Sequence, residues 1–319
     1  MKLLRLAVLL CLAASAVAQE RVEREIARLE QTLKSVEAAP DDLPKDVHSL
    51  FEAHRAALER ARKALSPEYR LYRLRDAFVG IETLAFLARE KGSAASVDTF
   101  ERLWKTHAAR FEAQPPAARG TLLQRALVES AVTRAGRLYR ASLPYAKAAA
   151  PWSGVYYLGE AEGNLRFRDF VQSLAAAETE KAPSRERVTS MLEALERDTL
   201  AFFGADVTNQ NVVPVSVRLK ETRELLDAGR TAGATLLLVE ARAALSRRGG
   251  PRGTYPAATP TGSMAALLEA WASDEQPPMN DALRDDVVPF YGALFTAGGT
   301  APRPKTAHVT VTLVRWPYT

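Results

Sequence analysis

The sequence contains only one cysteine, Cys11, among its 319 residues. A disulfide needs two cysteines and a thiolate metal site needs several, so neither can hold this fold together. Packing must supply the stability, and 47% hydrophobic residues are enough to build a core. A chain of this length accommodates one large domain or two smaller ones.

The first 18 residues have the pattern of a secretory signal peptide, with a basic start and a short apolar stretch. Ala16-Val17-Ala18 then supplies the small-x-small pattern that signal peptidase recognises. We therefore predict cleavage before Gln19 and a periplasmic or secreted mature protein. Cys11 lies among leucines and away from the predicted cut, which favours an ordinary signal residue over a lipidated one. The apolar stretch is too short to span a membrane stably, and we expect no integral membrane segment.

Blocks of like charge are missing as well. Cleavage would remove Lys2 and Arg5 but no acidic residue, which lowers the formal net charge from +5 to +3. Acidic and basic residues are interspersed along the rest of the chain, as they are on solvated helix faces. This pattern, together with export, predicts no nucleic-acid partner.

Helical periodicity covers nearly all of the chain from Gln19 to about Gly298. Leu74, Phe78 and Ile81 recur at three- and four-residue steps, as one buried helix stripe should. Proline and glycine clusters delimit the segments. We predict helices near 20–38, 44–65, 67–91, 96–113, 117–149 (with a break or kink at Pro144), 152–180, 184–203, 214–228, 232–248, 263–274 and 281–297. Because the links are short, consecutive helices should be antiparallel.

The predicted fold class is all-α: antiparallel helical hairpins packed as a solenoid-like or bundle array, with one short C-terminal β-strand. After the signal peptide (1–18), residues 19–248 form the helical-hairpin domain, 249–262 a flexible loop and 263–297 a C-terminal helical hairpin. Residues 298–319 form a linker and the strand, which the alternating β-branched run at 308–314 predicts. A lone strand must pair with another segment or another chain.

Two hairpin segments resemble the tetratricopeptide repeat (TPR) family. Residues 148–167 carry Leu158-Gly159 on a helix that begins after a proline, and residues 225–245 carry a turn at Gly229 followed by Ala234 and Ala241 at helical spacing. In that family a Leu-Gly pair allows close packing, and small residues on the second helix let the two helices interlock. The resemblance covers residues 136–245 and implies a TPR-like helical-repeat array.

The segment LLDAGRTAGATLLLVEARAAL (225–245) is the most motif-like stretch of the chain. A phosphate-binding P-loop would need a preceding strand and a Gly-Lys-Ser/Thr ending, and a dinucleotide fingerprint would need three glycines. This segment has a predicted helix before it and only Gly229 and Gly233. We interpret it as the turn between two packed helices.

Patterns that indicate catalysis or metal binding are scarce. His48 and Glu52 lie four residues apart and share a helix face, but such a pair is more typical of a solvated surface than of a metal site. Glu160 and Glu162 point to different sides of a helix and so are not a catalytic carboxylate pair. We predict no catalytic, cofactor-binding or metal-binding residues.

Aromatic residues crowd one helix and its start, and exposed aromatics anchor protein interfaces. The candidate partner-binding residues are Trp152, Tyr156, Tyr157 and Phe167. We expect a non-enzymatic module that binds a protein or acts as a scaffold in the cell envelope. The alternative is an enzyme or small-molecule binding protein with a pocket near Tyr156, Tyr157 and Glu160. In a third hypothesis the helices are structural and the strand at 308–314 adds to a partner's sheet.

Overall fold

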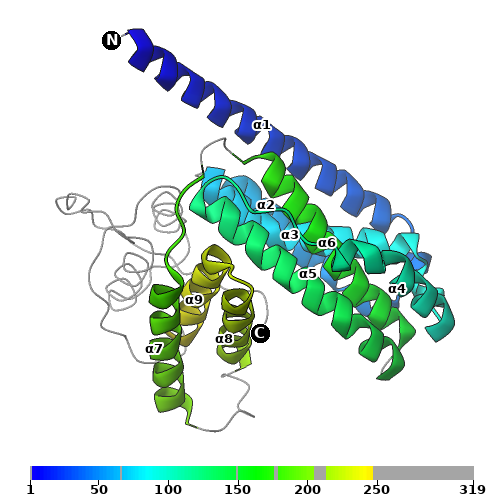
Figure 1. The fold of residues 1–319 in the computed structure, drawn as a ribbon. Coiled ribbons are helices and arrows are strands. Elements are labelled where there is room, and N and C mark those ends of the chain that lie inside the picture. The colour runs from blue at the N-terminus through cyan, green and yellow to red at the C-terminus, as the bar shows by residue number, and fades with distance from the viewer. Residues whose placement is uncertain (1, 65–66, 149, 176–178, 205–212, 247–319) are drawn as a thin grey trace. The chain divides into compact units, whose positions relative to one another are not determined.

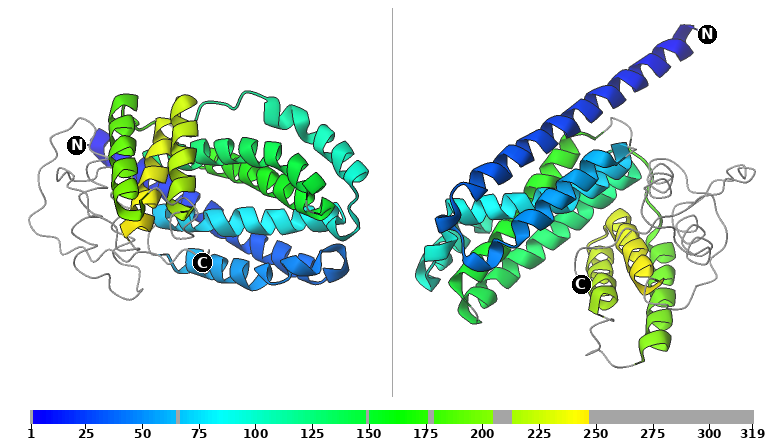
Figure 2. Two further views of the ribbon diagram at one scale, coloured as in Figure 1. Left: turned by 90° about the horizontal axis from the view of Figure 1, so that it is seen from below. Right: turned by 180° about the vertical axis from the view of Figure 1, so that it is seen from behind.

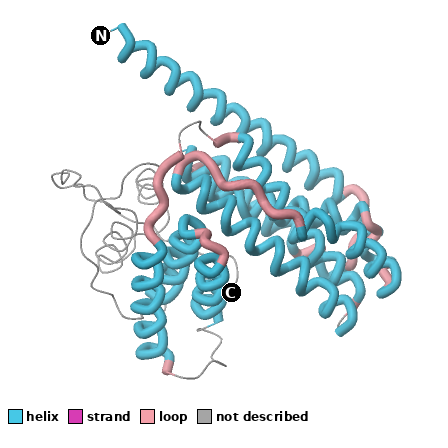
Figure 3. Tube along the Cα trace, viewed as in Figure 1, coloured by secondary structure: helices cyan, strands magenta, loops and turns pink. Residues whose placement is uncertain are grey.

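The computed structural model describes residues 2–64, 67–148, 150–175, 179–204 and 213–246. These residues form nine α-helices and three short 3-10 helices joined by loops, with no strand among them (Figure 3). The all-α class is confirmed for this part of the chain. The predicted loop at 249–262, the hairpin at 263–297 and the strand at 308–314 lie outside the described residues.

The nine helices match the nine that periodicity predicts up to residue 248, with shifted ends (Figure 1). They are α1 (Lys2–Glu37), α2 (Leu50–Lys63), α3 (Pro67–Arg89), α4 (Val97–Glu112), α5 (Leu122–Ala148), α6 (Pro151–Ser173), α7 (Arg185–Phe203), α8 (Val213–Asp227) and α9 (Thr231–Ser246). The 3-10 helices are η1 (Pro40–Asp42), η2 (Lys45–Val47) and η3 (Gly92–Ala94).

Several helix boundaries differ from the prediction, among them the start of α5, which lies at Leu122 rather than near 117. The first turn predicted at residue 44 is the separate 3-10 helix η2, and α2 begins only at Leu50. Helix α6 ends at Ser173 rather than near 180. Helix α1 begins at Lys2 and runs through the predicted cleavage site, and the first buried residue among its described side chains is Val22. Helix α5 continues through Pro144 to Ala148.

The chain divides into two compact units. Unit 1 comprises Met1–Gln114 and Ala135–Leu174, and unit 2 comprises Pro115–Arg134 and Ala175–Thr319. The first half of α5 therefore belongs to unit 2 and its second half to unit 1.

Helix α3 is the centre of unit 1. It contacts α1, α2 and α6, and α4 contacts α6 in turn (Figures 1 and 2). Leu74, Ile81 and Leu84 of α3 have no exposed surface. An apolar stripe of this kind is stable when neighbouring helices cover it, which fits the central place of α3.

Helix α4 is held to the second half of α5 by a stack of three aromatic rings. The Tyr139 ring lies between Trp104 and Phe111, with centroids 4.7 Å and 4.5 Å away. The Trp104 indole N–H also donates to the Tyr139 carbonyl oxygen at 3.1 Å. A capping box of Ser96 and Thr99 starts the helix. Local capping and aromatic packing together place α4 in unit 1.

In unit 2, α8 and α9 form a helical hairpin. Gly229 between them has a φ of 71°, in the left-handed region that favours glycine. The Arg230 N–H donates to the Leu225 carbonyl at 2.8 Å, and the Gly229 N–H donates to the Leu226 carbonyl at 3.0 Å. This is the Schellman pattern of a helix C-terminus. The segment 225–245 is thus a helix-hairpin turn, as predicted.

The start of α9 packs closely on the first half of α5, also within unit 2. A Cβ on Gly233 would lie 2.9 Å from the Glu129 Cβ and 3.1 Å from the backbone nitrogen of Ser130. Oε2 of Glu129 accepts a hydrogen bond from the Gly233 N–H at 2.8 Å. A carboxylate is favourable at the positive end of a helix dipole, so Glu129 caps a helix that is distant in sequence.

Candidate functional site

Helix α6 carries most of the predicted site residues, and glycines set its position against α3. A Cβ on Gly159 would lie 3.0 Å from the Phe86 ring, and one on Gly163 would lie 2.9 Å from the Val79 carbonyl oxygen. Gly163 faces Val79 and Gly159 faces Phe86. Residue numbers therefore rise along α3 in the direction in which they fall along α6, so the two helices are antiparallel. Only glycine permits backbones this close.

The first turn of α6 packs equally closely on the end of α5. Pro151 begins the helix, where its missing N–H costs no hydrogen bond. A Cβ on Gly154 would lie 2.4 Å from the Ala146 Cβ and 3.0 Å from the Ser142 carbonyl oxygen. The close contact of Gly154 with α5 therefore fixes which face of this turn of α6 points away from α5.

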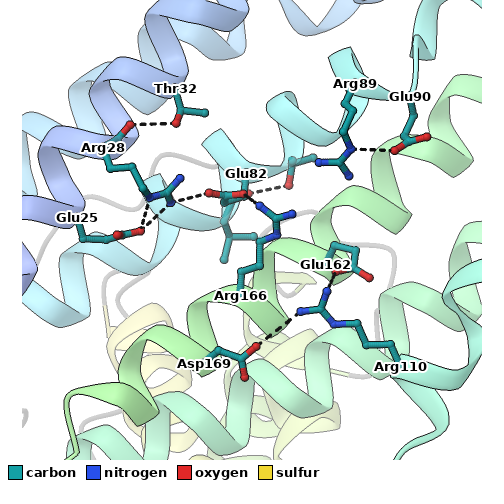
Figure 4. A network of polar contacts seen from close by, with 12 residues as sticks. Glu25, Arg28, Thr32, Glu82, Arg89, Glu90, Arg110, Glu162, Arg166 and Asp169 are labelled. Carbon is teal, nitrogen blue, oxygen red and sulfur yellow. Dashed lines mark hydrogen bonds and ion pairs between the residues drawn. The ribbon is translucent and has the colours of Figure 1, made fainter.

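A buried carboxylate on α3 joins three helices of unit 1. The Glu82 side chain is 4% exposed. Its Oε1 accepts a hydrogen bond from Arg28 Nη2 of α1, and its Oε2 accepts one from Arg166 Nη1 of α6, both at 2.6 Å (Figure 4). Each carboxylate oxygen thus has its own cation, which offsets the cost of removing the charge from water.

A second buried carboxylate, Glu162, lies on α6. Its side chain is also 4% exposed, and it accepts hydrogen bonds from His107 Nδ1 and Arg110 Nη1 of α4, both at 2.6 Å. Burial raises the pKa of Glu162, but the hydrogen bond from His107 and the charge of Arg110 outweigh it, so the pKa is lowered overall. Arg110 also reaches Asp169 at 3.6 Å (Figure 4).

Three of the four predicted partner-binding residues, Trp152, Tyr156 and Tyr157, lie on the first turns of α6, and Tyr145 of α5 stacks on one of them. Tyr145 of α5 is 44% exposed, and its ring stacks on Tyr157 with centroids 4.3 Å apart. Tyr156 meets Tyr157 edge to face at 5.9 Å. Trp152, Tyr156 and Tyr157 are half-buried. We name Tyr145, Trp152, Tyr156 and Tyr157 the aromatic surface.

Burial and the neighbouring Tyr145 hydroxyl raise the pKa of Tyr157. Its hydroxyl is therefore neutral at physiological pH. The aromatic surface offers flat rings and uncharged hydroxyl groups, a combination that is enriched at protein interfaces.

Phe167, the fourth predicted site residue, lies in the core. It has no exposed surface, and its ring meets Phe78 edge to face at 5.4 Å. Its position on α6 differs from that of Tyr156 because it faces α3 rather than solvent. We therefore exclude Phe167 from the aromatic surface.

Unit 1 also contains a pocket of about 290 Å³. It is lined by Glu90 at the end of α3, by Ala95, by Val155 of α6 and by one face of α4: Thr99, Phe100, Arg102, Leu103 and Thr106. Val155 precedes Tyr156 in the sequence, but Tyr156, Tyr157 and Glu160 do not line the pocket. Its volume lies just below the range for ligand pockets, roughly 300–1,000 Å³.

The histidines have different roles from the ones that spacing suggests. His48 packs beside Phe51 with ring centroids 5.9 Å apart, and His54 is buried against Gly80. His107 pairs with Glu162. Within the part of the chain that the structure describes, no group of three or more histidine, cysteine, aspartate or glutamate side chains could hold a metal ion.

The two buried carboxylates were not predicted from the sequence. A signal was present for Glu82, because it follows Phe78 by four residues and so falls on a predicted buried stripe. No local signal joins Glu162 to His107, which lies 55 residues away. Only the packing of α4 on α6 brings them together.

Comparison of the chain with protein-family models, with curated proteins and with solved structures gives no match. Among the helices of the described residues, none has both the length and the apolar content to cross a membrane.

Proposed function

We propose that this chain is an exported, non-enzymatic helical protein that binds a protein partner in the cell envelope through the aromatic surface. The observation that carries the proposal is the ring stack at the α5–α6 turn, where Tyr145 is 44% exposed and covers Tyr157. Rigid aromatic side chains lose little conformational entropy on binding, which makes such clusters effective anchors.

The rigidity of the scaffold supports the same proposal. Gly154, Gly159 and Gly163 hold α6 against α5 and α3, and the ion pairs of Glu82 and Glu162 link it to two further helices of unit 1, α1 and α4. A surface that is held in place before binding pays a smaller ordering cost when the partner arrives. We extend the proposal to a TPR-like array of hairpins, which the close α8–α9 turn supports.

A photo-crosslinking amino acid at Tyr145 tests the partner surface in cells. We expect one dominant crosslinked protein, and we expect the same probe at exposed Gln31 of α1 to give none of it. The Tyr145→Ser/Tyr156→Ser double variant should lose this partner in affinity capture while it keeps the helical circular dichroism signal. Equal crosslinking from both positions would disprove a partner at the aromatic surface.

Export has a separate test. N-terminal sequencing of the protein recovered outside the cytoplasm should begin at Gln19 if Ala16-Val17-Ala18 directs cleavage. A protein that keeps its Met1 end would contradict the predicted signal peptide, and it would leave the partner experiment unaffected.

The alternative function, binding of a small molecule, is favoured by the pocket beside Val155. The pocket lies one residue from the aromatic surface in sequence, although its lining differs from the residues that the sequence suggested.

A further inference from the structure

The pocket between α3, α4 and α6 has an apolar floor. Phe100 and Val155 are already out of water, at 1% and 2% exposed, so the apolar surface that the lining leaves open comes from the half-buried Ala95 and Leu103. An unbranched chain of a few methylene groups would remove this surface from water, and apolar burial is favourable in proportion to the area covered. The floor therefore suits the apolar part of a small ligand.

The threonines at the rim offer acceptors rather than donors. The Thr106 hydroxyl donates to the Arg102 carbonyl oxygen at 2.9 Å, and the Thr99 hydroxyl donates to the Ser96 carbonyl oxygen at 2.9 Å. The Thr99 oxygen also accepts a bond from the Ser96 N–H at 2.9 Å. Since a hydroxyl has one proton, what Thr106 still presents is an acceptor lone pair.

Glu90 contributes negative charge to the same rim. Its Oε1 accepts a bond from the Arg89 Nε–H at 2.9 Å, as Figure 4 shows. Among the described residues no protein group donates to its other oxygen, Oε2. Glu90 also follows the last residue of α3, where the helix dipole adds further negative potential. Arg89 supplies one cation to this carboxylate, and Oε2 offers a position for a second cationic donor.

We propose that this pocket binds a ligand with an apolar chain and a cationic, hydrogen-bond-donating head, such as a primary ammonium group. The chain lies on Ala95 and Leu103, and the ammonium group donates to Glu90 and Thr106. A free alkylamine and a lysine side chain of a peptide share this chemistry. The inference does not depend on the partner proposed for the aromatic surface.

Arg102 is the one cationic residue in the pocket lining, and it opposes a cationic ligand. Its side chain is exposed, whereas that of Glu90 is 27% exposed, so water and salt screen Arg102 more strongly. This difference gives the two residues opposite expected effects. Neutralising Glu90 should weaken binding of a cation, and neutralising Arg102 should leave it unchanged or strengthen it.

Calorimetry of the purified full chain with three probes of equal length tests the head group: hexylamine (protonated at pH 7), hexanol and hexanoate. We expect hexylammonium to bind in the millimolar range and about tenfold more tightly than hexanoate. Shortening the amine should weaken binding by up to about fourfold per methylene group. Hexanoate binding as tightly as hexylammonium would overturn the proposal.

Variants place the ligand in the pocket. Glu90→Gln should weaken hexylammonium binding about tenfold, whereas the matched Glu101→Gln, which removes the same charge outside the pocket lining, should not. Ala95→Trp should fill the pocket and abolish binding, with the thermal midpoint as the check on folding. Binding that survives Ala95→Trp, or that is unaffected by Glu90→Gln, would refute the assignment.

A competition experiment distinguishes a lysine side chain from a free amine as the natural ligand. A short peptide with one lysine should displace hexylammonium if the natural ligand is a lysine side chain, and the same peptide with norleucine in its place should not. Binding of hexylammonium with no displacement by the lysine peptide assigns the pocket to a free amine.

Discussion

Gly163 of α6 lies so close to α3 that a Cβ in its place would be 2.9 Å from the carbonyl oxygen of Val79. The obstructing atom belongs to the backbone and cannot rotate away as a side chain would. This contact therefore sets the separation of the two helices that carry Glu82 and Glu162, and through them the position of α6.

Gly163→Ala should destabilise the protein by about 1–3 kcal/mol, because it forces α3 and α6 apart. The matched substitution Gly136→Ala in α5 meets only the flexible end of Arg140, at 3.4 Å. It should stabilise the protein by up to about 1 kcal/mol, since alanine favours a helix more than glycine does. Urea unfolding of both variants measures the difference. Equal losses for the two would mean that the α3–α6 contact is not tight.

Removal of both cations from Glu82 should cost much more than removal of either one. In the Arg28→Ala/Arg166→Ala variant a side chain that is 4% exposed keeps its negative charge without a partner. Loss of all partners from a buried charge costs about 3–5 kcal/mol. We expect the lower end of this range, because the side chains of Arg28 and Arg166 are 44% and 43% exposed and water already screens them. Chemical denaturation of the single and double variants checks the non-additivity.

Glu82→Gln supplies the control for the Glu82 experiment. With no charge at this position, the double arginine variant should lose about 1 kcal/mol or less beyond lost side-chain packing. If the double arginine substitution lowers the free energy of unfolding equally in the wild type and in Glu82→Gln, the arginines act through packing and not through charge.

His54 should make the protein less stable in mild acid. Burial lowers its pKa from 6.5 to about 4, only partly opposed by the charge of Asp76, and its Nε2 has no hydrogen-bond partner. The unfolded chain therefore binds a proton below pH 6.5 while the folded chain does not until about pH 4. The contribution of His54 to stability is full above pH 6.5 and is lost as the pH falls toward 4, about 2 kcal/mol of it by pH 5.

The measurement is the free energy of unfolding at pH 7 and at pH 5 for the wild type and for His54→Leu. Between pH 7 and pH 5 the free energy of unfolding of the variant should fall by about 2 kcal/mol less than that of the wild type, because leucine has no group that binds a proton. His48→Gln, a half-buried histidine on the preceding segment, is the matched control. An identical pH response in the wild type and in His54→Leu would contradict this role for His54.

We expect the cap that Glu129 forms on α9 to need a hydrogen-bond acceptor and not a negative charge. Burial raises its pKa, and the Gly233 N–H and the charge of Arg125 offset only part of that rise. The folded state therefore holds the proton more tightly than the unfolded chain, and this stabilisation is lost as the pH rises through the raised pKa. At pH 7 the neutral Glu129→Gln, which keeps an acceptor, should be at least as stable as the wild type.

Glu129→Ala removes the acceptor as well and should cost about 1 kcal/mol relative to Glu129→Gln, the usual size of a lost helix cap. Thermal unfolding at pH 7 compares the two variants. If Glu129→Gln is instead less stable than the wild type, the carboxylate charge itself stabilises the start of α9.

Helix positions could be read from the sequence because their signals are local. The periodicity of Leu74, Phe78 and Ile81 predicts the buried stripe of α3, and the turn at Gly229 needs only a residue that tolerates a positive φ. Propensity and capping act over one or two turns of chain. The start of α2 and the end of α6 were predicted less well, because terminal turns depend on their neighbours in space.

Local sequence signals could not predict which aromatic residues are exposed. Tyr145 lies on the surface and Phe167 in the core, although both belong to apolar-rich helices. Burial depends on which face another helix covers, and that is a property of the packed unit.

The sequence by itself therefore determined the helical class, the order of the nine helices and the hairpin turn at Gly229, because each follows from short-range backbone and hydrophobic preferences. Only the tertiary structure decided that Glu82 meets Arg166, 84 residues away, and that Glu162 meets His107. Contacts at such separations depend on how α3, α4 and α6 pack, and the contact of Gly163 with the α3 backbone sets the α3–α6 part of that packing.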